Sequence, residues 1–391
     1  MTELDKLYLE LCMSSVFRKV LEKPLFKCFS EYFREGIGNA EKIKAYAAFV
    51  SEIYSSGASL TDLVARLVFE DENVYIKARA KKETVSSDIL AAVKAELSVF
   101  ERFAALTPDD FARELEAPYV SPFASYKTDL FGAYEERILG IDRYGYGIFS
   151  SSPMFRLSDD KVLEPIASAD KTSMDKFVGY EDERGKVIAN TLAFIEGRPA
   201  ANTLLCGDAG TGKSSTVKAV SNSFFDRGIR LIELRKDQLK YLPYVMGKIN
   251  DNPLKFIIFI DDLSFNQNDD NFSMLKAALE GSASAKADNA VIYATSNRRH
   301  IIKETFGDRD GDDVHRNDTM QEMLSLSERF GLVVLFSKPN KSLYLDIVHE
   351  LAERGGVKMD FSELDILAEA FALRRGSRSA RCAEQFIDSL L

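Results

Sequence analysis

The chain has 391 residues, 46% of them hydrophobic, and its 51 Lys and Arg against 61 Asp and Glu give a net charge of −10. This composition predicts two or three globular domains, excludes a disordered chain, and excludes a general attraction for DNA or RNA, so that any nucleic-acid contact would have to be local. The four scattered cysteines form no CxxC pair, which argues against a zinc site and a disulfide framework. No apolar run approaches the ~20 residues of a membrane span, which argues against membrane insertion. Together these features predict a cytoplasmic protein.

The first part of the chain is predicted to be helical. Apolar residues recur at i, i+3 and i+4 in stretches such as 14–33 and 86–106, with few strand signals. We therefore expect residues 1–143 to form an N-terminal helical domain with a partner-binding or a structural role. Residues 144–173 follow as a linker that contains short strands, and "SDDK" at 158–161 suits a hairpin turn.

Strands and helices alternate in the next part of the chain, residues 174–338. Short apolar runs separated by helical stretches indicate a parallel sheet covered by helices on both faces, an α/β fold. Two acidic segments of this region, 266–271 and 304–318, are interpreted as surface loops rather than metal sites. The predicted strands are 202–207, 229–234, 255–260, 290–295 and 331–336.

A small helical domain, residues 339–391, is predicted to end the chain. Asp360 and Glu363 form a capping-box start for one helix, and Ser377 is the expected cap of the last helix.

The stretch "GDAGTGKSS" after the first of these strands is a candidate phosphate-binding loop. Residues 207–214 fit GxxxxGK[ST] at every fixed position, with a predicted strand before them and a predicted helix after them. The glycines allow backbone N–H groups to point at phosphate oxygens, while Lys213 would reach the β- and γ-phosphates and Ser214 would ligate Mg²⁺. A chance glycine turn is the alternative. The expected nucleotide contacts are Gly207, Asp208, Ala209, Gly210, Thr211, Gly212, Lys213, Ser214 and Ser215.

Polar side chains end two of the other predicted strands. Asp261 and Asp262 follow the apolar run 255–260, and Asn297 follows the run 290–295. Because ligands of open α/β sheets bind at the carboxyl ends of the strands, we expect Asp261 to hold Mg²⁺ and Asp262 to activate a water for attack on the γ-phosphate. Asn297 would lie between the phosphate-binding loop and the two acids and hydrogen-bond the γ-phosphate or the water. The alternatives are ordinary polar turns after strands.

These motifs, in this order, resemble the AAA+ ATPases over residues 174–391. The resemblance identifies 207–214 as Walker A, "FIIFIDD" at 256–262 as Walker B, Asn297 as sensor 1 and "SLSERFGL" at 325–332 as the arginine-finger segment. More narrowly, phrases such as "IDDLSF" and "YATSNRRH" resemble a bacterial AAA+ family of unknown function akin to helicase-loader and transposition-helper ATPases. The resemblance implies an α/β core at 174–338, a helical lid at 339–391, and ATP and Mg²⁺ as cofactors.

The resemblance also implies roles for four further residues. Val178 and Gly179 match the segment that lines the adenine pocket. Arg329 matches the finger that enters a neighbouring subunit's site, which implies a homo-oligomer such as a ring; a surface ion pair with a nearby glutamate is the alternative. Arg378 matches the lid arginine called sensor 2, with competitors at Arg374, Arg375 and Arg381.

The sequence therefore predicts an ATPase that remodels or loads a macromolecular partner, a protein or nucleoprotein, with Lys213, Asp262, Asn297 and Arg329 as catalytic residues. The second acid of Walker B is Asp262, whereas the commonest AAA+ pattern has a glutamate, so weak basal hydrolysis is expected. The alternative function is a slow ATP-dependent switch or loader that acts on nucleic acid or a helicase. A small-molecule kinase is a third class, but the sequence shows no acceptor site for it.

Overall fold

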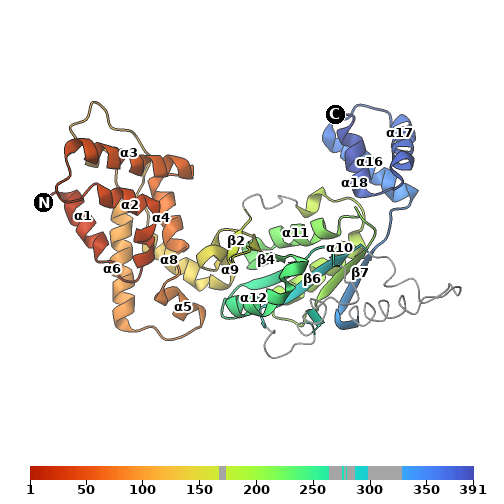
Figure 1. Ribbon diagram of the computed structural model, residues 1–391, viewed down its shortest axis with the longest axis horizontal. Helices are drawn as coiled ribbons and strands as arrows, with labels where there is room; N and C mark the ends of the chain where they lie inside the picture. The colour runs from red at the N-terminus through yellow and green to blue at the C-terminus, as the bar shows by residue number, and fades with distance from the viewer. Residues whose placement is uncertain (167–172, 264–274, 277–278, 280–286, 298–327) are drawn as a thin grey trace. The chain divides into compact units, whose positions relative to one another are not determined.

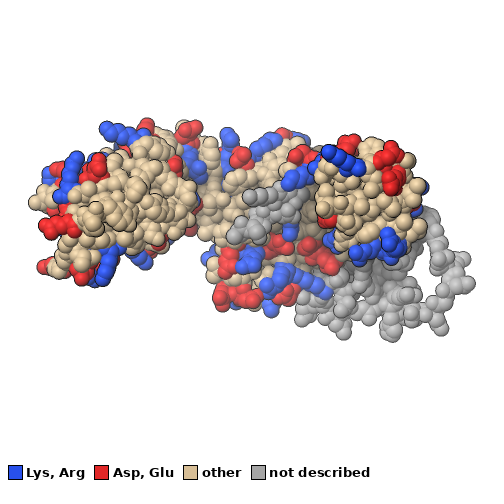
Figure 2. Space-filling view, turned by 90° about the horizontal axis from the view of Figure 1, so that it is seen from above, with Lys and Arg blue, Asp and Glu red and all other residues tan. Residues whose placement is uncertain are grey.

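A computed structural model describes residues 1–166, 173–263, 275–276, 279, 287–297 and 328–391. The chain divides into two compact units, Met1–Ser151 and Ser152–Leu391. None of the helices in the described ranges is long and apolar enough to cross a membrane. Basic and acidic side chains are interspersed on the face of the molecule that Figure 2 shows.

The first unit is helical, as its apolar periodicity predicts. Ser59, Asn73 and Ser86 cap the N-termini of three of its helices by accepting a backbone N–H with the side chain. Its α-helices are α1 (Glu3–Cys12), α2 (Pro24–Glu31), α3 (Asn39–Ser56), α4 (Leu60–Phe69), α5 (Val74–Ala80), α6 (Ser87–Ala104), α7 (Pro108–Ala112), α8 (Leu130–Leu139) and α9 (Ile141–Tyr144).

Aromatic rings dominate the core of this unit. Phe26, Phe29 and Phe103 pack with ring centroids 4.8 Å apart in two pairs, and each ring is at most 3% exposed. A buried carboxylate fixes the segment after α1, because Glu96 on α6 accepts the backbone N–H groups of residues 15–17 at 2.8–3.1 Å. These contacts hold α1 and α2 against α6.

A seven-stranded sheet forms the centre of the second unit (Figure 1). Its order is β2-β1-β4-β5-β6-β3-β7, and every pairing is parallel except that of β1 with β2. The predicted α/β fold is thereby confirmed. The strands are β1 (Met154–Leu157), β2 (Leu163–Pro165), β3 (Thr203–Gly207), β4 (Ile229–Leu234), β5 (Lys255–Ile260), β6 (Ala290–Ser296) and β7 (Leu332–Phe336).

Helices cover the sheet because its strands are apolar on both faces. All five residues of β3 are buried, and so are five of the six residues in both β4 and β5. Helices α10 (Glu181–Ile195) and α11 (Lys213–Ser223) pack Val187, Val217 and Val220 onto one face of the sheet. Helix α12 (Leu242–Ile249) lies between β4 and β5 in the chain.

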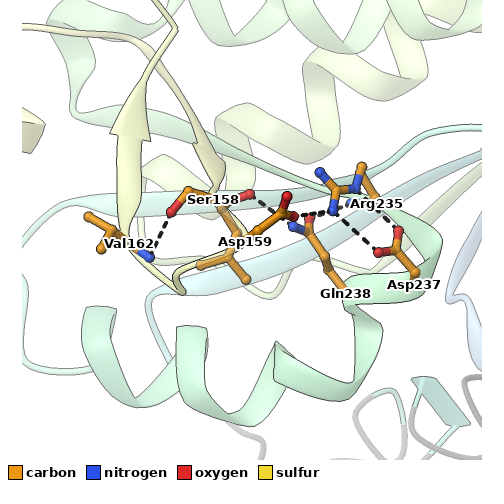
Figure 3. Close-up of polar contacts among 7 residues, drawn as sticks. Ser158, Asp159, Val162, Arg235, Asp237 and Gln238 are labelled. Atoms are coloured by element: carbon orange, nitrogen blue, oxygen red, sulfur yellow. Dashed lines mark hydrogen bonds and ion pairs between the residues drawn. The ribbon is translucent and has the colours of Figure 1, made fainter.

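The hairpin β1–β2, which the sequence places in a linker, joins the sheet beside β4. Strand β1 runs parallel to β4, with Phe155 opposite Ile232. Arg235, just after β4, lies between Asp159 and Asp237 and donates to both at 2.6 and 3.2 Å (Figure 3). The buried Gln238 adds a hydrogen bond to the carbonyl of Leu157 at 2.9 Å. These contacts fasten the hairpin turn to the end of β4.

Three helices form the C-terminal lid: α16 (Lys341–Gly355), α17 (Phe361–Arg375) and α18 (Ala380–Asp388). They enclose a separate core that includes Tyr344, Val348 and Phe386. Asp360 caps α17, as the sequence predicts, but its side chain accepts the N–H of Ser362 rather than that of Glu363, so the predicted capping box is not formed. Ser379 caps α18, however, so that this helix begins later than a cap at Ser377 would place it.

Candidate nucleotide-binding site

Three glycines shape the loop between β3 and α11. Gly207, Gly210 and Gly212 have φ values of +135°, +76° and +87°, a region that side chains with a Cβ rarely adopt. A Cβ at Gly207 would lie 2.0 Å from the carbonyl oxygen of Phe336, at the end of β7. The next N–H, that of Asp208, donates to this same oxygen at 3.2 Å. The loop therefore rests directly on the end of β7 and leads into the N-terminus of α11.

Lys213, the first residue of α11, is folded back over this loop. Its side chain is almost fully buried, and Nζ donates to the carbonyl oxygens of Gly207 at 3.1 Å and Asp208 at 2.6 Å. Burial lowers the pKa of this ammonium group, and the nearby Asp208 carboxylate partly opposes that shift. A phosphate bound over the loop would bring negative charge to a buried cation and to the positive end of the α11 dipole.

Asp261 connects this loop with the middle of the sheet. It follows β5, and its Oδ1 accepts hydrogen bonds from the hydroxyls of Ser214 on α11 at 2.6 Å and Thr295 on β6 at 2.5 Å. Strand β6 lies between β5 and β3, so the carboxyl ends of these three parallel strands meet at one edge.

Asp262 and Asn297 extend the same cluster. The Asp262 backbone has φ +52°, a left-handed conformation that Asp tolerates better than most residues, and its N–H donates to Thr295 Oγ1 at 2.9 Å. The Asn297 amide Nδ2 donates to Asp262 Oδ1 at 2.8 Å. The second acid is thus held by a backbone bond on one side and a side-chain bond on the other.

A cavity of about 300 Å³ lies over these residues. One wall consists of the phosphate-binding loop and the polar cluster, from Ala209 to Ser215 together with Asp261, Asp262, Thr295 and Asn297. The apolar part of the lining includes Phe177, Val178, Tyr180, Ile347 and Leu351, with the charged Lys176 and Arg184 among them. A lining that combines this polar cluster with apolar side chains suits a ligand that has both a charged group and a flat apolar group.

Residues of the lid form part of the cavity lining beside the phosphate-binding loop. The backbone N–H of Arg381, on the first turn of α18, donates to the carbonyl of Gly210 at 3.3 Å. Ala380, Arg381 and Glu384 line the cavity on this side. The lid therefore contacts the phosphate-binding loop itself.

Most of the predicted nucleotide contacts line this cavity, but Gly179, Gly207, Asp208 and Arg378 are not among its lining residues. Gly179 lies behind Val178, where a Cβ would be 2.4 Å from Leu343 Cδ1. Arg378 forms a bidentate ion pair with Glu369 on α17, at 2.8 and 2.6 Å, and is not among the lining residues. Arg381, three residues later, does line the cavity.

Arg329 lies far from the phosphate-binding loop of its own chain. It precedes β7, and β7 pairs with β3 from Leu332 opposite Thr203 to Phe336 opposite Gly207. Four residue steps of ~3.3 Å put roughly 13 Å of strand between Leu332 and the loop, and Arg329 lies before Leu332. The segments 266–271 and 304–318, interpreted above as surface loops, lie outside the described residues.

Sequence reasoning missed several residues of the cavity, among them Thr295, Tyr180 and Arg184. Thr295 lies on β6 two positions before Asn297, which follows the strand, so alternation along an extended backbone could have placed both on one face. Tyr180 belongs to the apolar part of the lining, and its hydroxyl donates to the carbonyl of Ser337 at 2.6 Å. Arg184 packs over the ring of Phe177 at 5.0 Å, and burial lowers the pKa of its guanidinium group.

The donor set at Ser214 and Asp261 fits a magnesium ion bound together with phosphate. A hydroxyl and a carboxylate oxygen lie 2.6 Å apart at the end of the loop, and Mg²⁺ prefers one or two such protein oxygens together with phosphate and water. Within the described ranges, no group of three or more His, Cys, Asp or Glu side chains forms an all-protein metal site.

Comparisons with solved structures find distant similarities. The chain is similar to RuvB of Thermotoga maritima, described as a Holliday junction branch migration motor, with 13% identity over 56% of this chain and 72% of that chain and a TM-score of 0.34. It is also similar to the replication initiator DnaA bound to AMPPCP and single-stranded DNA, with 16% identity over 56% of this chain and 64% of that chain and a TM-score of 0.40. These scores are too low to support a functional inference.

Sequence comparison identifies the family. No curated protein matches the chain. A family model does match, over residues 150–391, which span the hairpin, the sheet, the cavity and the lid. The chain therefore belongs to the family described as "Protein of unknown function (DUF815)".

Proposed function

We propose that this chain is an AAA+-type ATPase that binds ATP with Mg²⁺ in the cavity and hydrolyses it to remodel or load a macromolecular partner. One observation carries the proposal: Lys213, the Ser214–Asp261 pair and the Asp262–Asn297 pair converge on one cavity from the N-terminus of α11 and the ends of two adjacent strands, β5 and β6. A phosphate loop, a metal-binding pair and a water-orienting pair are the parts that phosphoryl transfer to water requires.

ATP would lie across the cavity with its triphosphate on the loop. The inward N–H groups of the loop and Lys213 would hold the phosphates, while Phe177, Val178 and Ile347 would form the wall against the base. Gly179 would act indirectly, because its lack of a Cβ lets Leu343 pack behind this wall.

Ser214 and Asp261 would hold the metal, and a bound Mg²⁺ would neutralise charge between the β- and γ-phosphates. Asp262 would orient the attacking water and accept its proton, with Asn297 beside it. In this arrangement Asn297 already occupies one oxygen of Asp262. An Asp is also one methylene shorter than Glu, roughly 1.5 Å of reach, and a misplacement of about 1 Å costs ~10² in rate. We therefore expect slow basal hydrolysis.

Arg329 would serve the site of a neighbouring subunit. It precedes β7, at the strand end opposite its own phosphate-binding loop, and this position supports a role in trans rather than in cis. A finger of this kind contributes ~10³–10⁵ in rate in phosphoryl-transfer enzymes. The competent enzyme would then be a homo-oligomer with its sites at subunit interfaces.

Arg381 is our candidate for the lid arginine that contacts the nucleotide. It lines the cavity beside Gly210, whereas the guanidinium group of Arg378 is engaged by Glu369. The Arg378–Glu369 pair would instead brace α17 against the start of α18.

A second candidate function is a slow ATP-dependent switch or loader that acts on nucleic acid or a helicase. The hydrogen bond from Asn297 to Asp262 favours it, since a carboxylate held in this way is a poor base until a partner moves it. Under both proposals the N-terminal helical region would bind the partner and determine its selection.

Purified full-length protein tests the proposal. We expect ATP binding and a slow, Mg²⁺-dependent release of phosphate that a partner accelerates; turnover of tens per second by the protein alone would contradict slow basal hydrolysis. An Asp262→Asn variant should hold ATP and its partner together for capture from a cell extract. Stimulation of turnover by DNA or RNA would favour the loader, and indifference to both would favour remodelling of a protein.

A further inference from the structure

Thr295 makes a pair of hydrogen bonds that links both acids of the site. It lies near the end of β6, its side chain is 2% exposed, and it comes from the strand between the phosphate loop and the acids. Its hydroxyl donates to Asp261 Oδ1 at 2.5 Å and accepts the N–H of Asp262 at 2.9 Å. One buried hydroxyl therefore sets the side chain of one acid and the backbone of the next.

The two hydroxyl groups that donate to Asp261, those of Ser214 and Thr295, would respond differently when a nucleotide and metal bind. Ser214 would itself contact the metal, so its hydrogen bond to Asp261 must rearrange. The bond from Thr295 can persist, since Thr295 lies on a central strand and does not contact the loop helix through this group. A β-branched side chain is also restricted in χ1, which keeps the hydroxyl in place.

The backbone bond matters for the second acid. Asp262 adopts a left-handed conformation, with φ +52°, which costs free energy unless surrounding contacts hold it. Its N–H donates to Thr295 Oγ1 at 2.9 Å and, more weakly, to Asp261 Oδ1 at 3.1 Å. Without the Thr295 hydroxyl, the turn that directs the Asp262 carboxylate toward Asn297 and the cavity loses its better acceptor.

We propose that Thr295 is a positioning residue of the ATPase site: its hydroxyl holds Asp261 ready for Mg²⁺ and fixes the turn that directs Asp262 at the attacking water. This inference rests on the proposed function. In this proposal the residue acts through the two acids to which its hydroxyl is hydrogen-bonded. Partners that orient metal ligands typically contribute 10- to 100-fold, roughly, in metal affinity or activity.

The test compares Thr295→Val, which removes the hydroxyl at nearly constant shape, with Thr295→Ser, which keeps it. Both are made in the full-length chain. Binding of a fluorescent ATP analogue is titrated first in EDTA and then at rising Mg²⁺, and the Mg²⁺ concentration for half-maximal turnover, kcat, KM and Tm are measured in parallel. The binding titrations read metal affinity without relying on catalysis.

For Thr295→Val we expect nucleotide affinity in EDTA within about twofold of wild type, a roughly tenfold higher requirement for Mg²⁺, and kcat lower by about 10- to 100-fold with little change in KM. Thr295→Ser should stay within about threefold of wild type in each measurement. A Thr295→Val protein with wild-type Mg²⁺ dependence and kcat would overturn the inference, as would one that loses only Tm.

A third variant guards against misfolding. If Thr295→Val does not fold, Thr295→Cys, which retains a weak S–H donor of similar size, is expected to shift the Mg²⁺ requirement in the same direction. An unshifted requirement in Thr295→Cys would then count against the proposal. Failure of the proposed function is distinguishable, because in that case the wild-type protein itself binds no ATP analogue; failure of this inference alone leaves wild-type binding and turnover intact.

Discussion

Replacing Gly207 with alanine tests how closely the phosphate-binding loop must approach β7. An ideal Cβ at this position lies 2.0 Å from the carbonyl oxygen of Phe336, and real Cβ atoms essentially never approach closer than 3.0 Å. The loop or the end of β7 must therefore move by about 1 Å, the difference between these two distances. The φ of +135° adds strain for any residue with a Cβ.

Two effects of different size follow from this geometry. The backbone strain alone costs about 1–3 kcal/mol of the free energy of unfolding. The displacement of about 1 Å moves the N–H groups that would grip the phosphates, and a shift of this size costs ~10² in rate. We therefore expect Gly207→Ala to be folded but less stable, with ATP turnover reduced about a hundredfold.

Gly197→Ala is the matched control. Gly197 follows α10, has φ +69°, and no atom lies within 4 Å of its would-be Cβ. It should lose stability, by about 1–2 kcal/mol, and keep nucleotide binding. The assay is urea unfolding together with titration of a fluorescent ATP analogue and steady-state turnover. Wild-type nucleotide affinity and turnover in Gly207→Ala, or equal loss of both in the two variants, would refute the reasoning.

Three further predictions concern arginines of the site and lid. Arg329→Ala and Lys213→Ala should each hydrolyse ATP at least ~10³ more slowly than wild type. An equal mixture of the two variants should recover roughly a quarter of wild-type turnover, because about one subunit interface in four then combines an intact Lys213 with an intact Arg329. No recovery on mixing would contradict action in trans. Arg381→Ala should weaken ATP binding by about tenfold or more in an equilibrium titration while Arg378→Ala leaves it unchanged, and the reverse pattern would restore Arg378 as the nucleotide contact. The hydrogen-bonded ion pair with Arg378 lowers the pKa of Glu369 below its ordinary value of 4.5. The pair therefore stabilises the fold above pH 4.5, and this stabilisation is lost as the pH falls through the lower folded-state pKa. Glu369→Gln should have a lower Tm than wild type at pH 7, and the Tm values of the two proteins should converge in acid; a Tm difference that stays constant down to pH 3 would speak against this origin.

The sheet was predictable because its strands are buried on both faces. The runs 229–234 and 255–260 coincide with β4 and β5, and the other predicted core strands differ from β3, β6 and β7 by a single residue at one end. Apolar runs bounded by loops carry this information locally. Which strands become neighbours does not follow from such runs, and the parallel pairing of β1 with β4 joins segments far apart in the chain, with Phe155 opposite Ile232.

The lid shows why some site residues escape sequence reasoning. Arg378 and Arg381 are three positions apart, and the start of α18 decides which of them faces the phosphate-binding loop. Ser379 caps this helix rather than Ser377, so Arg381 falls on its first turn beside Gly210. Both serines suit a cap by residue type, and only tertiary packing separates them.

Thr295 escaped for a different reason. A threonine within an apolar strand is ordinary in composition, because β-branched residues favour strands. Its importance arises from the register that places β6 between β5 and β3, which aligns its hydroxyl with Asp261. The motif letters locate the loop and the acids, and strand alternation places Thr295 on the same side as Asn297, but the hydrogen bonds of Thr295 to both acids appear only in three dimensions.

Calorimetric titration with ATP of wild-type protein, Lys213→Ala and Lys218→Ala tests the central claim most directly. Both lysines lie on α11, but Lys213 reaches over the phosphate-binding loop while Lys218 pairs with Glu233 at 3.5 Å. We predict one ATP bound per chain in wild type and in Lys218→Ala, with affinity lower by about 10- to 100-fold in Lys213→Ala. Wild-type affinity in Lys213→Ala, or an equal loss in both variants, would contradict the assignment of this cavity as the ATP site.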